Sequence, residues 1–132
     1  MLLEALIAIL IFSMGILAIV GMQASAVKAS GDAKFRSDAS LVANQLIGQM
    51  WVDNRAPATL QANFQGGGGT DGAAYTAWLA DVQAALPGAA ANPPTVTVNV
   101  ATSLVTVTVR WIAPGEPAAA PPHSYTVVAQ II

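Results

Sequence analysis

The feature that most constrains this chain is an apolar segment at its beginning that contains a single acidic residue. From Ala5 to Val27 no residue is charged, and Glu4 lies inside the apolar block rather than beside it. The block has no proline and, at about 1.5 Å per helical residue, would reach across roughly 30 Å of hydrocarbon. Residues 1–27 are therefore predicted to form a membrane-spanning helix. Its carboxylate needs an explanation, because burying a charge in lipid is costly.

Two interpretations of Glu4 are open at this point. In a plain signal anchor the carboxylate would lie in the headgroup layer, whereas an acid kept within the bilayer usually serves a function. A cleaved secretory signal is disfavoured, because no basic leader precedes the apolar run and no clear small-x-small cleavage site ends it. Met1 looks like a clipped or reassigned start.

Composition limits what can follow the apolar segment. Charged residues make up 9% of the chain, against about 25% in ordinary soluble domains. The remaining length supports one small domain, residues 28–132. One face of the long helix must contribute to its core, because the domain is small. Cysteine is absent, so no disulfide or thiolate-metal site is available, and a net charge of -2 with five scattered basic residues predicts no nucleic-acid partner.

The helical pattern continues past the apolar block and becomes amphipathic from Val27 onward. Apolar residues recur at spacings of three and four, while charged and amide side chains occupy the opposite face. The predicted buried stripe consists of Phe35, Ala39, Val42, Ala43, Leu46, Ile47, Met50 and Trp51. One continuous helix over residues 2–52 is the economical interpretation.

After Pro57 the periodicity stops, and residues 65–72 form a glycine-rich segment, Gln65-Gly-Gly-Gly-Gly-Thr-Asp-Gly72. We expect a flexible connection with no side chains able to pack. A phosphate-binding loop is the weaker alternative, since no Lys-Ser or Lys-Thr follows the glycines and no strand precedes them. A loop ion site using Asp71 is also possible and weaker still.

The last part of the chain predicts a short helix and a small sheet. The helix covers residues 73–86, with Trp78, Leu79, Val82 and Leu86 on its inner face. Period-two runs of β-branched residues at 95–100, 104–112 and 124–132 predict an antiparallel meander. Its valines should face the amphipathic half of the long helix and its threonines should face solvent.

No catalytic or metal-binding set is recognisable. The only histidine, His123, follows a proline-rich loop and is interpreted as an ordinary surface residue. The carboxylates are dispersed without zinc or calcium spacing, and no cysteine can form a nucleophile pair. We therefore expect a protein that is not an enzyme, with no catalytic residues, metal or cofactor.

The N-terminal segment resembles a known family. Leu2-Leu-Glu-Ala-Leu-Ile-Ala-Ile-Leu-Ile-Phe12 is similar to the type IV pilin-like N-terminal motif, and the segments at 15–24 and 35–50 are most similar to minor pilins of the type IV pilus modification (PilV) class. The resemblance covers roughly residues 1–55. It implies the α+β type IV pilin fold, a long N-terminal helix packed by a small C-terminal antiparallel sheet. That layout agrees with the one reached from periodicity.

The resemblance also implies partners and a location. A prepilin peptidase would cut before a methylated phenylalanine, although the glycine and phenylalanine of that motif are not in this sequence. The subunit would sit in the bacterial inner membrane with its head in the periplasm, and would then join other pilin and minor pilin subunits in a pilus filament. Glu4 corresponds to the family's conserved acid, which is thought to meet the N-terminal amine of a neighbouring subunit.

Gly15 and Gly21 flank a stretch corresponding to one that loses helicity in some assembled filaments of the family. They weaken a helix by roughly 1 kcal/mol each relative to alanine. The alternative is that they let neighbouring helices approach closely, and both interpretations stay open.

Three function classes follow from the sequence. A minor pilin that initiates, caps or modifies the pilus is favoured. A type II secretion pseudopilin of the GspI class shares the same N-terminal motif and is the second. A membrane-anchored binding domain that never polymerises is the third.

Overall fold

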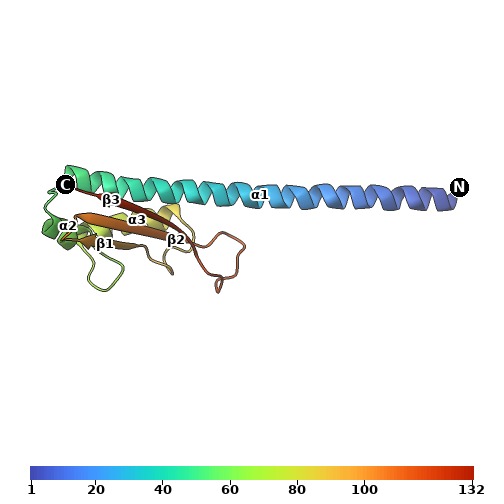
Figure 1. Cartoon of the computed structure of the whole chain (residues 1–132). Coiled ribbons are helices and arrows are strands. Elements are labelled where there is room, and N and C mark those ends of the chain that lie inside the picture. The colour runs from blue at the N-terminus through green and yellow to red at the C-terminus, as the bar shows by residue number, and fades with distance from the viewer. The chain divides into compact units, whose positions relative to one another are not determined.

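The computed structural model describes residues 1–132 as three helices followed by three strands (Figure 1). The helices are α1 (Leu2–Val52), α2 (Pro57–Phe64) and α3 (Ala73–Ala85). The strands are β1 (Thr95–Asn99), β2 (Leu104–Trp111) and β3 (His123–Gln130). The predicted α+β class, the continuous helix over residues 2–52, the helix near 73–86 and the three strands are confirmed.

The chain divides into two units, Met1–Ala33 and Lys34–Ile132. The first unit consists of the apolar part of α1. The second contains the rest of α1, the two short helices and the sheet, and it holds the whole hydrophobic core. The predicted division after residue 27 refers to the bilayer and stays a prediction.

The second half of α1 provides one wall of this core. Its fully buried positions follow the spacing of three and four that the sequence indicated, and Phe35 packs against them while partly exposed. They are Ala39, Val42, Ala43, Leu46, Ile47 and Met50. The prediction for Trp51 was wrong, because this side chain is 44% exposed. At about 3.6 residues per turn it lies roughly 100° around the helix from Met50, outside the buried stripe.

The sheet is an antiparallel meander with strand order β1-β2-β3. Val96 pairs with Val107, which in turn pairs with Val127, so one face carries an apolar row across all three strands. The valines of β1 and β2 are buried in the same core as the α1 stripe, as predicted. The threonines lie on the other face, half or fully exposed.

A short helix that the sequence analysis did not predict follows α1. Pro57 was interpreted as the point where helical pattern stops, whereas it occupies the first turn of α2. Proline suits that position because its missing N–H would have no helical partner there. Leu60 and Phe64, four residues apart, are buried and fix this helix to the core.

The glycine-rich segment packs against its neighbours at Gly66 and Gly72, where the prediction of a connection without packing was wrong, while Gly68 and Gly69 are exposed as expected. Gly66 and Gly72 are buried, and Gly66 exchanges two backbone hydrogen bonds with Val96 of β1, at 3.1 and 3.0 Å. A Cβ added to Gly66 would collide with the ring of Tyr75, and one added to Gly72 would collide with the backbone of Asn63. These glycines are therefore packing positions that admit no side chain.

Two aromatic residues join α3 to the other elements. Trp78 donates a hydrogen bond from its indole Nε1 to the carbonyl oxygen of Val42 in α1, at 2.8 Å. Tyr75, which was not in the predicted core, donates its hydroxyl to the carbonyl oxygen of Pro94 just before β1, at 2.7 Å. Burial raises the pKa of Tyr75, and the charge of Asp71 adds to the rise while Arg110 opposes it. The phenol thus stays neutral as a donor.

The outer edge of β1 is closed by the chain itself. Val96 is bonded to Gly66, and the next residue pointing the same way is Val98. Its N–H donates to Oε1 of Gln65, and its carbonyl oxygen accepts from Nε2 of Gln61, both at 3.5 Å. The end of α2 and the loop after it therefore take the place of a fourth strand.

Substituting Gly66 should destabilise the second unit. We expect Gly66→Ala to lower the free energy of unfolding by about 1–3 kcal/mol, because the methyl group must displace the buried Tyr75 ring. Gly68→Ala is the matched control, since nothing lies within 4 Å of its Cβ position. It should leave stability unchanged or slightly higher. Urea unfolding followed by tryptophan fluorescence measures both, and equal effects of the two substitutions would contradict the packing role.

Candidate functional site

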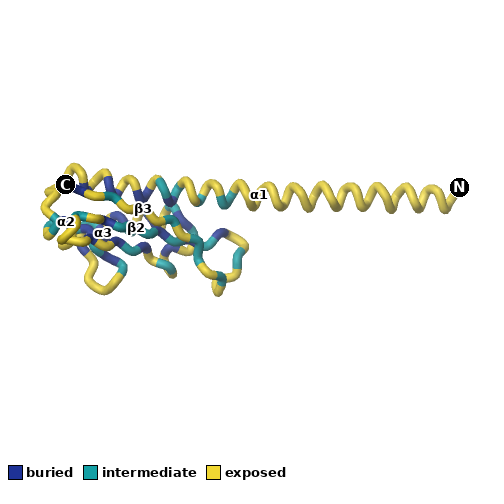
Figure 2. The backbone as a smooth tube through the Cα atoms, viewed as in Figure 1, coloured by how far each residue is buried: buried dark blue, intermediate teal, exposed yellow.

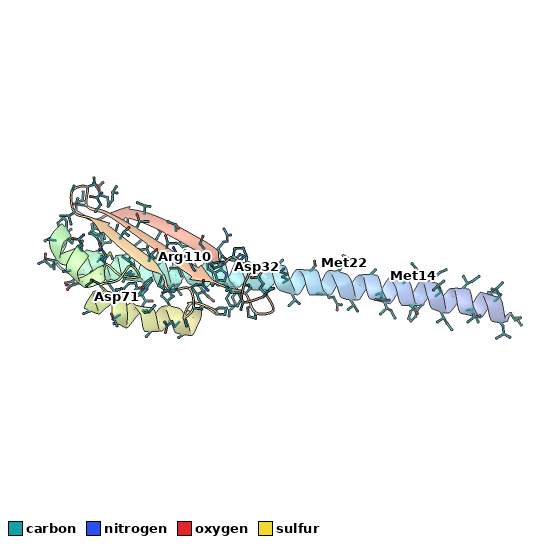
Figure 3. All side chains as sticks on the ribbon, turned by 90° about the horizontal axis from the view of Figure 1, so that it is seen from below. Met14, Met22, Asp32, Asp71 and Arg110 are labelled. Atoms are coloured by element: carbon teal, nitrogen blue, oxygen red, sulfur yellow. The ribbon has the colours of Figure 1, made fainter.

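The largest functional feature is the apolar surface of the first unit. Every residue from Met1 to Ser30 is exposed, as Figure 2 shows along α1. Large apolar side chains point outward on all sides of this helix, and Figure 3 shows Met14 and Met22 projecting from it. Those more than half exposed before Gln23 are Met1, Leu2, Leu3, Leu6, Ile9, Leu10, Ile11, Phe12, Met14, Leu17, Ile19, Val20 and Met22.

By length and composition α1 is able to cross a membrane. Its most apolar 18-residue window has a mean hydropathy of 2.7, and none of that window is buried. A soluble monomer rarely exposes an apolar surface of this extent, because keeping it in water is unfavourable. The surface is therefore compatible with a single-pass membrane anchor.

The backbone and side-chain polar groups of the apolar segment are suited to a medium without water. From Ala5 onward its backbone N–H groups are paired within the helix, which is a requirement in hydrocarbon. Ser13, the only hydroxyl between Glu4 and Gln23, donates to the carbonyl oxygen of Ile9 at 2.7 Å. Glu4 thus carries the one strongly polar side chain before Gln23 that has no partner inside the helix.

Glu4 lies in the first turn of α1 and is exposed. Its carboxylate is in no ion pair within the chain, where Lys34 pairs with Asp38 and His123 lies against Glu116. A carboxylate in the first helical turn is favoured by the helix dipole, by roughly 0.3–1 kcal/mol near a surface. That contribution is smaller than the cost of several kcal/mol for a charge at the centre of a bilayer. A cationic partner outside this chain would offset the remainder.

Gly15 and Gly21 lie within the regular helix, and α1 is unbroken across them. No atom lies within 4 Å of the position that a Cβ would take at either residue. The single chain therefore provides no packing reason for the two glycines. Both interpretations, local loss of helix and close approach of a neighbouring helix, concern an assembled state and stay predictions.

The structure brings together one cluster in the second unit that sequence reasoning did not anticipate. Nε2 of His123 lies 3.0 and 3.1 Å from the two carboxylate oxygens of Glu116, and its ring stacks on Trp111 with centroids 5.7 Å apart. Oε2 of Glu116 also accepts from the backbone N–H of Ala113 at 3.2 Å. The cluster thereby holds both ends of the proline-rich loop, and only the proximity of His123 to Glu116 in sequence hinted at it.

Asp71 is engaged in holding its own loop. Its Oδ1 accepts from the backbone N–H of Gly67 at 2.8 Å, and the residue that precedes α3 is Gly72, so no side chain caps that helix. Gly67 has a φ of 81°, a conformation that favours glycine. Asp71 therefore stabilises the conformation of the glycine-rich loop.

No family model, curated protein or solved structure matches this chain. Two features of the structure define the class of this protein. They are a long apolar N-terminal helix, able to span a membrane, and a small α+β unit with a three-stranded antiparallel sheet.

Replacing the two glycines should strengthen the helix of the isolated subunit. In detergent micelles, the double variant Gly15→Ala/Gly21→Ala should slow amide hydrogen exchange around residues 15–21 by about five-fold, since each glycine costs roughly 1 kcal/mol. Ala18→Gly, between the two sites, is the matched control and should speed exchange. Exchange that is unchanged in both variants would show that these glycines do not weaken the helix.

Proposed function

We propose that this chain is a minor pilin subunit of a type IV pilus. The subunit is held in the bacterial inner membrane by residues 1–27 and joins a filament through the same surface, where it initiates, caps or modifies the pilus. The observation that carries the proposal is the fully exposed, all-round apolar surface of α1 with one carboxylate, Glu4, in its first turn. The α+β layout with an antiparallel sheet is consistent with a pilin-like fold.

The physical argument begins with the surroundings of α1. A helix with an apolar surface on every side can leave the bilayer only if other apolar helices replace the lipid around it. Lipid and protein contacts are then nearly equivalent in hydrophobic terms, so packing and polar pairing decide whether assembly is favourable. Exposed side chains around the whole helix allow contact with several neighbours at once.

Glu4 supplies the polar pairing in this proposal. A carboxylate surrounded by apolar helices is costly unless a cation neutralises it, and the N-terminal amine of a neighbouring subunit is such a cation. Because the amine and the acid are placed at fixed positions on each helix, their pairing sets the axial register between neighbours. Lipid alone offers no equivalent partner at a defined height.

Two other functions stay open for the same surface. A type II secretion pseudopilin would use the helix identically and would be found with a secretion system. A membrane-anchored binding domain would keep the helix in lipid permanently. The similarity of residues 15–24 and 35–50 to minor pilins favours the pilus, and co-purification with sheared pili separates it from both alternatives.

Removing the carboxylate should block assembly but not membrane insertion. Glu4→Ala and Glu4→Gln should each lower the amount of subunit in sheared pili by roughly ten-fold or more, because an unpaired buried charge on the neighbour costs about 3–5 kcal/mol. The amount in the membrane fraction should not fall. Asp81→Ala, at an exposed carboxylate on α3, should behave as the unmodified chain. Normal incorporation of both Glu4 variants would exclude this role.

The mature N-terminus should carry the mark of pilin processing. Mass spectrometry of the protein isolated from its native host should find a methylated phenylalanine ahead of Met1. A secretion pseudopilin would give the same result. An uncut leader would instead favour the function of a membrane-anchored binding domain.

A further inference from the structure

We draw no further inference here: the strongest candidate, the unpaired outer edge of β3 in the three-stranded sheet, carries none, because nothing in the structure shows what covers it.

Discussion

The fold of the second unit depends on covering one face of a three-stranded sheet. A sheet of this size is not stable alone and needs a packed partner on its apolar face. Residues 39–50 of α1 supply that partner, and the valines of β1 and β2 bury against them. The hydrogen bond from Trp78 to the carbonyl oxygen of Val42 adds α3 to the same core. Without the second half of α1, the sheet would have an uncovered apolar face.

This role explains why α1 changes character along its length. A helix that covers a sheet needs one apolar stripe and one polar face, as residues 34–52 have. A helix surrounded by lipid or by other apolar helices needs apolar side chains on every side, as residues 5–27 have. The two patterns share a period but differ in width, so one uninterrupted helix can meet both requirements.

Closing a sheet edge is the second structural requirement of the unit. Backbone groups at an edge need partners or protection, and the chain provides partners for β1 with two glutamine side chains and one glycine backbone. Gly66 is required at that point because the ring of Tyr75 occupies the space of a side chain. The glycine-rich run is therefore part of the packing of the sheet.

The sequence alone determined the features that depend on local patterns. The period of 3.6 defined α1 and its buried stripe, the period of two defined the strands, and the long uncharged run with Glu4 defined the candidate site. All of these are encoded within one element, so no knowledge of distant residues is needed. The prediction that Trp51 is buried was wrong because Trp51 lies just beyond the margin of the stripe. Burial at that position depends on how far the domain extends around the helix.

Tertiary structure decided what depends on contacts between elements. The burial of Gly66 requires Tyr75 and Val96 to be in place, and the pairing of His123 with Glu116 requires the proline-rich loop to fold back to the beginning of β3. No pattern in the sequence predicts that Gln61 and Gln65 bond to the edge of β1. Such contacts join residues far apart in sequence or depend on the path of a loop. No periodicity in the sequence predicts them, because these side chains become neighbours only after the core has formed.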